Sequence, residues 1–239
     1  QHLLNNISIT NILIKLLLRL GVAYCQLGKF ADALVSYQRV YLMVNPTLKQ
    51  QDNQDEQQES KSSSINLIID HMTLQNDIKN LEKLEAATSL KKEADVQFAK
   101  GALQQAFDMY TQALDHVQAH AGCLSNRAAC RLAMHDEQGC VDDCSAALEL
   151  LGVGSGPVAV TARAELTNST LKDSFNMLSA LLPGANSDRR KAWLLKTHVR
   201  RGAVLLNLKQ YKLALEDYNA AIVIDPNNES LVLDAKRIS

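Results

Sequence analysis

Large and small apolar residues recur at helical spacing along most of the chain, in pairs of short segments separated by a turn. In the first pair the leading segment ends with residues 20–24 (LGVAY), and Gly28 breaks the helical pattern. The residues that follow, Phe30, Ala33 and Tyr37, share one face of a second segment. Because two such faces can interlock only as antiparallel helices, the pattern predicts an all-α chain built of helix–turn–helix pairs.

The same layout returns three more times along the chain. A small residue in the middle of each leading segment marks the phase, and these markers are Gly21, Ala94, Ala128 and Gly202. The steps between them are 73, 34 and 74 residues. The middle step is the tetratricopeptide period, and each outer step is one period plus an insertion. On these residues the chain resembles tetratricopeptide repeat (TPR) proteins, which implies helix–turn–helix repeats stacked as a right-handed α-solenoid with inserted linker helices.

The chain is expected to have four parts, with the second insertion inside the last of them. Residues 1–46 are expected to form an N-terminal TPR-like helical hairpin, and residues 47–64, rich in Gln and Ser, a disordered linker. Residues 65–87 predict an amphipathic connecting helix, which either packs on the repeats or forms an intermolecular coiled coil. Residues 88–239 hold the other three repeats, with an insertion at 152–187 and a C-terminal capping helix. The apolar face expected for the connecting helix carries Ile65, Ile68, Met72, Ile78, Leu81 and Leu84.

Local signals also place several helix ends around the second insertion. The glycine run that begins at Gly152 is expected to end a helix at Leu151, because no strand or phosphate-binding signature accompanies it. Ser169 or Thr170 would cap a short amphipathic helix ending before Pro183. Ser187 or Asp188 would begin a long helix that continues to Leu208.

Composition and charge exclude several classes of function. The 239 residues include only 10 Gly and 4 Pro, and the formal net charge is -1, so no overall basic surface for nucleic acid is expected. Five cysteines in a chain of this length suit a reducing, cytoplasmic compartment. The apolar run Ile12–Tyr24 contains Lys15 and Arg19 and is short for a membrane span, so no membrane is expected. The chain begins at Gln1 without an initiator Met, so we expect its natural N-terminus to lie upstream.

The reactive side chains do not form a catalytic or metal-binding pattern, so no enzyme activity and no cofactor are predicted. Cys130, His135, Cys140 and Cys144 form a conceivable zinc set, but the last two occupy packing positions of a repeat and are interpreted as core. His116 and His120 are one turn apart, and we interpret them as a cation site near a helix C-terminus.

Basic and amide side chains recur at one phase of the leading helices. Lys91 and Asp95 are one helical turn apart in the second repeat, and Asn126 lies in the third. Lys196 and Arg200 are again one turn apart in the last repeat. Because i, i+4 spacing puts each pair on one helix face, we expect these residues to line the concave groove of the stacked repeats.

With these residues the chain resembles the chaperone-binding TPR co-chaperones, whose "carboxylate clamp" holds the C-terminal Glu-Glu-Val-Asp tail of Hsp90 or Hsp70. The clamp residues that the resemblance implies are Lys91, Asn126, Lys196 and Arg200. Ammonium, guanidinium and amide donors suit the carboxylates of a peptide end. Asp95 stands where the clamp has Asn, and its charge would repel a peptide carboxylate or neutralise Lys91.

Each candidate also has a plainer interpretation. Lys91 and Asp95 would then be a surface ion pair, and Asn126 would make a structural hydrogen bond between helices. Lys196 and Arg200 would simply belong to the basic face of their helix.

A second resemblance covers residues 88–239. The phrases at 126–130 (NRAAC), 147–151 (ALELL), 198–202 (HVRRG) and 224–228 (IDPNN) are similar to the C-terminal repeats of axonemal dynein assembly factors of the dyslexia-susceptibility-candidate type. This implies a cytoplasmic, cilium-associated adaptor that works with Hsp90 or Hsp70 in dynein arm assembly, with a client that the sequence does not identify. The alternative is a scaffold of a ciliary or other multiprotein complex that binds its partner independently of chaperones.

Overall fold

The chain folds into helices, and no strand occurs in residues 2–45, 71–152, 181–182 and 187–238, which the computed structural model describes. The all-α class predicted from the sequence is confirmed. The chain divides into two compact units, with the boundary between Glu85 and Ala86. We call the described residues up to Glu85 the N-terminal unit and those from Ala86 the C-terminal unit. The expected linker at 47–64 and nearly all of the expected helix at 169–182 lie outside the described residues.

The N-terminal unit contains a helical hairpin of α1 (His2–Gln26) and α2 (Phe30–Val44). Gly28 adopts a φ of 70° in the turn between them, a conformation that glycine reaches without strain. Gly21 lies against the ring of Tyr37, and Ile14 and Cys25 are also buried in this unit. The small residue that marks the repeat therefore allows α1 and α2 to approach closely, as the sequence predicts.

The contact between Gly21 and Tyr37 gives a first testable prediction. A methyl group on Gly21 would lie 2.5 Å from Cε2 of Tyr37, whereas one on Gly202 would lie 3.2 Å from Cε2 of Tyr218. Gly21→Ala is expected to destabilise the hairpin by about 1–3 kcal/mol through overpacking. Gly202→Ala should be close to neutral, because a gain of about 1 kcal/mol in helix propensity offsets the milder contact. Amide hydrogen exchange in α1–α2 and in α9–α10 measures both effects, and equal losses would contradict the prediction.

Helix α3 (His71–Ala99) is longer than either helix predicted for this region. The connecting helix and the leading helix of the second repeat form one continuous helix, which passes through the boundary between the units. Within the N-terminal unit, Nε2 of Gln75 donates a hydrogen bond of 2.8 Å to the Tyr41 hydroxyl of α2. The ring of Tyr41 also lies 5.3 Å from that of His71. This part of α3 therefore packs within its own chain.

The buried face of α3 differs in part from the predicted one. Leu81 and Leu84 are fully buried as expected, but Met72 is 71% exposed, and Leu74 is buried in its place. The prediction for Met72 was wrong because Met72 lies nine residues before Leu81, and at about 100° per residue this places the two side chains on opposite faces of the helix. Ile65 and Ile68 of the predicted face lie outside the described residues.

Asp77 is a buried carboxyl group in the N-terminal unit. Its side chain is on α3, and burial raises its pKa from 3.8 to about 6. Burial, and after it the charge of Asp77, raises the pKa of Cys25 on α1 to about 12 and that of Tyr37 on α2 above its usual range. Within the described residues no Lys, Arg or His forms an ion pair with Asp77. The unit therefore holds a carboxyl group whose charged form is disfavoured.

The C-terminal unit continues the repeat pattern after α3. Its further helices are α4 (Leu103–His116), α5 (Ala121–Ala133), α6 (Glu137–Leu150), α9 (Asp188–Asn207), α10 (Tyr211–Ile224) and α11 (Glu229–Ile238). From α4 to α11 each helix contacts the next, and the leading helices α5 and α9 also contact each other. This unit is a stack of helix pairs, with α11 packed on α10 through Leu231 and Ala235.

The hairpin turns share one backbone feature across both units. The residues with positive φ in the four turns are Gly28, Gly101, His135 and Lys209, with φ of 70°, 79°, 64° and 60°. Two of them are not glycine, so the turn imposes this conformation even where a side chain makes it uncommon. The four hairpins predicted from the small-residue phase therefore also agree in their turns.

Helix ends around the second insertion follow the predicted signals. α6 ends at Leu150 with Leu151 as its C-cap, and Gly152 follows with a φ of 81°. Ser187 is the N-cap of α9, and its side chain accepts a hydrogen bond of 3.2 Å from the amide of Arg190.

The cysteines of the third repeat are core residues, as predicted. Cys140 and Cys144 are fully buried in a cluster with Ala128 and Val204, which joins α5, α6 and α9. Cys130 is also fully buried, and all three thiols are free.

Candidate functional site

Asp95 is the centre of a polar cluster that joins three helices of the C-terminal unit. Its Oδ2 accepts a hydrogen bond of 2.7 Å from Nζ of Lys91, one turn earlier on α3. Its Oδ1 accepts bonds of 2.6 Å from the Tyr110 hydroxyl on α4 and 2.9 Å from Nδ2 of Asn126 on α5. We call these four residues the Asp95 cluster. The structure thus brings three of the sequence-predicted site residues together, and it adds Tyr110, which was not predicted.

A second level of contacts lies one turn earlier, at Gly122. A methyl group on Gly122 would lie 3.1 Å from Cη2 of Trp193 on α9 and 3.3 Å from Cε of Lys91 on α3. Side chains of the first and last leading helices of the unit therefore both pack closely against Gly122 of the middle one. Arg189 lies over the ring of Trp193, 5.0 Å from its centroid.

The leading helices α5 and α9 are also joined beside Asn126. Arg200 donates hydrogen bonds to the carbonyl oxygen of Ser125 and, at 3.1 Å, to its hydroxyl. The hydroxyl of Ser125 lies 3.0 Å from that of Thr197. Arg200 of α9 therefore contacts Ser125, the residue next to Asn126, which itself belongs to the Asp95 cluster.

Lys196 and Arg200, which we call the cation pair, differ in how they are held. Lys196 is exposed, and Arg200 is half-buried against α5. Among the described residues, no Asp or Glu forms an ion pair with either one. The positive charges of the cation pair are therefore available to a bound anion, whereas the charge of Lys91 is paired with Asp95.

The interpretation of His120 as part of a cation site near a helix C-terminus is wrong. His120 is the N-cap of α5, and its Nδ1 accepts a hydrogen bond of 3.3 Å from the amide of Cys123. Burial, and after it the charge of Lys91, lowers the pKa of His120 to about 4. Because Nδ1 of His120 accepts a hydrogen bond from a backbone N–H, it cannot itself carry a proton, and the neutral ring is favoured.

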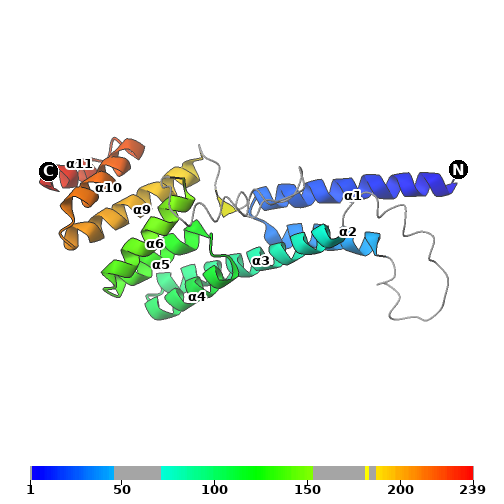
Figure 1. The fold of residues 1–239 in the computed structure, drawn as a ribbon, viewed down its shortest axis with the longest axis horizontal. Helices are drawn as coiled ribbons and strands as arrows, with labels where there is room; N and C mark the ends of the chain where they lie inside the picture. The colour runs from blue at the N-terminus through cyan, green and yellow to red at the C-terminus, as the bar shows by residue number, and fades with distance from the viewer. Residues whose placement is uncertain (1, 46–70, 153–180, 183–186, 239) are drawn as a thin grey trace. The chain divides into compact units, whose positions relative to one another are not determined.

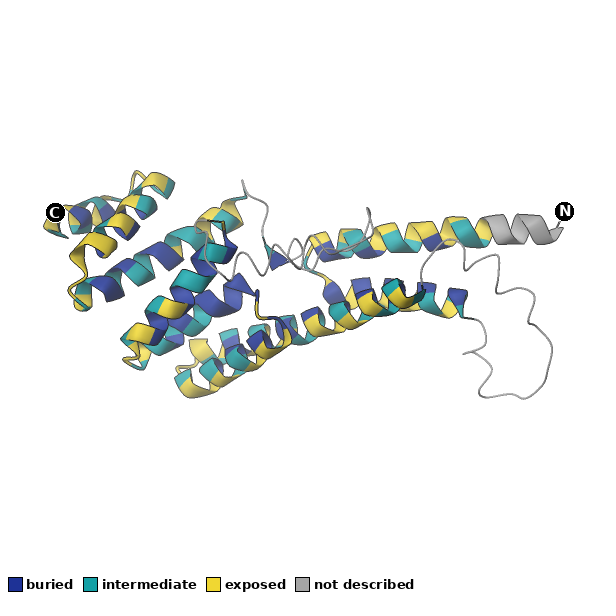
Figure 2. Ribbon diagram, viewed as in Figure 1, coloured by how far each residue is buried: buried dark blue, intermediate teal, exposed yellow. Residues whose placement is uncertain are grey.

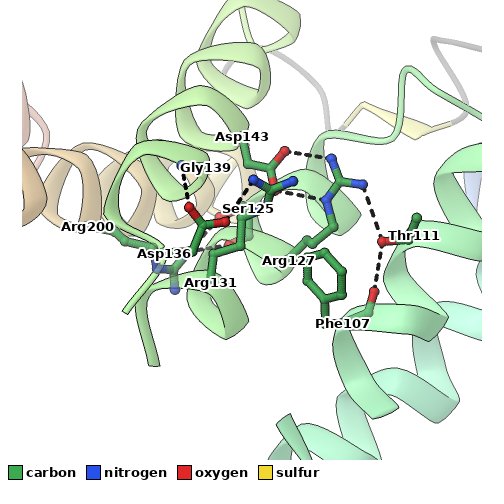
Figure 3. Close-up of polar contacts among 9 residues, drawn as sticks. All are labelled: Phe107, Thr111, Ser125, Arg127, Arg131, Asp136, Gly139, Asp143 and Arg200. Carbon is green, nitrogen blue, oxygen red and sulfur yellow. Dashed lines mark hydrogen bonds and ion pairs between the residues drawn. The ribbon is translucent and has the colours of Figure 1, made fainter. Parts of the chain in front are cut away.

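A buried ion pair beside the site joins the two helices of the α5–α6 hairpin. Arg127 on α5 binds Asp143 on α6 through Nε–Oδ2 and Nη2–Oδ1 distances of 2.8 and 2.6 Å (Figure 3). Its Nη1 also donates to Thr111 of α4 at 3.4 Å. Arg131 approaches the same Asp143 at 3.1 Å. The guanidinium of Arg127 thus joins its own hairpin to the preceding repeat.

The next repeat reproduces this arrangement with different residues. Arg201 binds Asp217 of α10 with two bonds of 2.8 Å and reaches Ser145 of the preceding α6 at 3.0 Å. Nδ1 of His198 donates a further bond of 2.7 Å to Asp217. Burial alone would raise the pKa of Asp217, but the hydrogen bonds from His198 and Arg201 outweigh it and hold that pKa below its usual range.

Besides Tyr110, sequence reasoning missed these ion pairs and Trp193. In both repeats the Arg and Asp are 16 residues apart, and each Arg directly follows a candidate site residue, Asn126 or Arg200. That spacing was a usable signal. Trp193, the single Trp of the chain, lies one turn before Lys196, and this too is visible in the sequence.

Two further features bear on the range of functions. Within the described ranges, no group of three or more His, Cys, Asp or Glu side chains is placed to hold a metal ion. One segment of the described helices, Ile9–Gln26 in α1, is long and apolar enough to cross a membrane by length and composition, with 17% of it buried in the structure. It is longer than the run Ile12–Tyr24 considered from the sequence. A core helix meets the same two criteria, so they do not assign α1 to a membrane.

Comparison with known proteins identifies the repeat and a group of relatives. Residues 195–228 match the family model of the tetratricopeptide repeat. Dynein axonemal assembly factor 4 of Pongo pygmaeus is 33% identical over 113 residues, which are 47% of this chain and 19% of the relative. The protein of that name from Rattus norvegicus is 31% identical over 149 residues, or 62% of this chain and 28% of the relative. The matched regions thus span less than a third of the relatives' length.

Solved structures of TPR domains are also similar to this chain. The first TPR of Spaghetti bound to the HSP90 peptide SRMEEVD is 21% identical, covers 64% of this chain and 90% of its own, and has a TM-score of 0.43. The Arabidopsis OM64 TPR domain is 22% identical, covers 65% and 96%, and has a TM-score of 0.45.

Proposed function

We propose that this tetratricopeptide-repeat protein, a relative of the dynein axonemal assembly factors, is an adaptor that binds the acidic C-terminal tail of Hsp90 or Hsp70 through its C-terminal unit. In doing so it would couple the chaperone to a client in dynein arm assembly, in the cytoplasm and in association with cilia. The peptide-binding residues would be Lys196 and Arg200 with Asn126 and Lys91, and Asp95 would modify the site.

The observation that carries this proposal is the cation pair beside the Asp95 cluster. Arg200 is held against Ser125, next to Asn126, and neither it nor Lys196 is paired with an acid among the described residues. An unpaired guanidinium and an ammonium one turn apart can both donate charge-assisted hydrogen bonds to a carboxylate. The names of the relatives support the link to dynein assembly but do not by themselves establish the partner.

Titration with the peptide SRMEEVD tests this function directly. The full chain is expected to bind the peptide, and Lys196→Ala or Arg200→Ala should each weaken binding about tenfold or more, because each removes a charge-assisted hydrogen bond. Binding should also weaken as ionic strength rises. Fluorescence of Trp193, one turn from Lys196 on α9, is the readout.

Two controls separate a specific site from general charge attraction. Arg237 on α11 forms only an exposed i, i+3 pair with Asp234, so Arg237→Ala removes the same charge without touching the site. It should leave the affinity within about twofold. The amidated peptide, which lacks the terminal carboxylate, should bind more weakly. Absence of binding by the intact chain, or an equal loss in Arg237→Ala, would contradict the proposal.

A chaperone-independent scaffold is the second candidate, and the surface of α1 favours it. Much of the described part of α1 in the N-terminal unit is exposed or half-buried (Figure 2). The large aliphatic residues exposed on it are Ile9, Ile12, Leu13, Leu16 and Leu20. Such a stripe is typical of a protein-interaction surface. Polar substitution of Ile12 and Leu16 should abolish partner binding under this alternative and leave SRMEEVD binding unchanged under the first.

A further inference from the structure

On one side of the site, the hydrogen-bond donors that a peptide carboxylate would need already donate to Asp95. Its two oxygens accept from Lys91, Tyr110 and Asn126 at 2.7, 2.6 and 2.9 Å. These donors come from three helices, α3, α4 and α5, so the carboxylate is held from several directions. Its side chain is nevertheless 42% exposed, so the negative charge faces whatever binds beside it.

The other side of the site is different. Lys196 and Arg200 on α9 form no ion pair with an acid among the described residues, and Arg200 reaches the residue next to Asn126. One carboxylate bound by the cation pair would therefore be neutralised. A second carboxylate beside Asp95 would lie where Lys91 and Asn126 already donate hydrogen bonds to Asp95. It would also lie next to a like charge, which is unfavourable.

We infer that the site accepts the acidic tail but prefers a chain end whose only carboxylate is the C-terminal α-carboxylate, because the charge of Asp95 weakens binding of a last side chain that is itself negative. The inference rests on the proposed function, because it assumes that a peptide end binds at the cation pair. A tail that ends in Asp is then a weaker ligand than the same tail ending in its neutral isostere. Specificity arises here from a repulsive element that the chain itself carries.

The peptides SRMEEVD and SRMEEVN test this preference on the unmodified full chain, because they differ only in the charge of the last side chain. SRMEEVN is expected to bind about tenfold more tightly, the effect of one like-charge contact at a partly exposed site. Fluorescence of Trp193 or calorimetry gives both affinities.

Substitution at position 95 completes a double-mutant cycle. Asp95→Asn keeps an oxygen that can accept from Tyr110 and Asn126 but removes the charge, so it should strengthen SRMEEVD binding about tenfold and abolish the preference for SRMEEVN. Asp108→Asn is the matched control, since Asp108 is exposed on α4 and is bonded only to Gln104 within the described residues. It should leave the affinity ratio unchanged.

The outcomes separate the two proposals. Equal binding of both peptides, or tighter binding of SRMEEVD, with affinity still lost in Arg200→Ala, overturns the inference and leaves the proposed function standing. If neither peptide binds the wild type or Asp95→Asn, both proposals are overturned. The wild-type affinity ratio decides the inference even if Asp95→Asn does not fold.

Discussion

Replacing Asp217 with alanine is expected to lower the free energy of unfolding of the C-terminal unit by about 3–5 kcal/mol. Asp217 is 2% exposed and is bound by Arg201 through two hydrogen bonds and by His198 through one. Alanine would leave the buried His198 and the partly exposed Arg201 without this acceptor. Desolvated donors then lose their hydrogen bonds, which is more costly than losing an exposed ion pair.

Denaturant unfolding followed by Trp193 fluorescence measures this effect, because the single Trp of the chain lies on α9 in the same unit. Asp234→Ala is the matched control: Asp234 pairs with Arg237 on the surface, and its loss should change stability by no more than about 0.5 kcal/mol. Asp217→Asn, which keeps one acceptor oxygen, should cost less than Asp217→Ala. A loss in Asp217→Ala no larger than that in Asp234→Ala would refute the prediction.

Asp77 should make the N-terminal unit more stable in mild acid than at neutral pH. Its folded pKa of about 6 lies above the ordinary 3.8, so the folded state binds the proton more tightly than the unfolded state. The contribution of Asp77 to stability is therefore greatest below pH 4 and is lost as pH rises through 6. A shift of this size corresponds to about 3 kcal/mol in total, of which about 1 kcal/mol is recovered between pH 7 and pH 5.

Hydrogen exchange of the α1 and α2 amides at pH 7 and pH 5, corrected for the intrinsic exchange rate, measures this dependence. Asp77→Asn should be more stable than the wild type at pH 7 and should show no such gain on acidification. Asp32→Asn is the control, because Asp32 is exposed in the first turn of α2. If the stability of the wild type and of Asp77→Asn responds alike to pH, burial of the Asp77 charge is not the cause of the pH dependence.

The pH dependence expected from Asp217 has the opposite sign. The pKa of Asp217 is lowered, so its contribution to stability is lost only as pH falls through that lower value.

Features set by local sequence could be predicted well. Gly21 and Gly202 mark close contacts between helices. Each is followed 16 positions later by a Tyr, Tyr37 or Tyr218, on the second helix of the same hairpin. The capping roles of Leu151 and Ser187 likewise depend on a few neighbouring residues. Helix phase was predicted less well in the connecting helix, where Met72 and Leu81 were assigned to one face although a spacing of nine residues puts them on opposite faces.

The arrangement of the candidate site depended on contacts that no local pattern contains. The spacing of Lys91 and Asp95 predicted their pairing, but the bonds from Tyr110 and Asn126 require α3, α4 and α5 to be in one particular register. The contact of Trp193 with Gly122 likewise crosses the second insertion. His120 was misread because two histidines one turn apart suggested one helix, whereas a helix ends at His116 and the next begins after His120.

The contact between Arg190 and Leu151 has a consequence for how the chain can vary in length. Nη2 of Arg190 donates a hydrogen bond of 2.5 Å to the Leu151 carbonyl, so the end of α6 and the first turn of α9 are held together although 39 residues separate the two positions. For a connection with fixed ends, each doubling of length costs only about 0.6 kcal/mol of closure entropy. The neighbouring repeats keep the same Arg–Asp geometry on both sides of it. This point is therefore a natural acceptor position for foreign sequence, where a tag or an entire folded module could be introduced while the helices around it retain their packing.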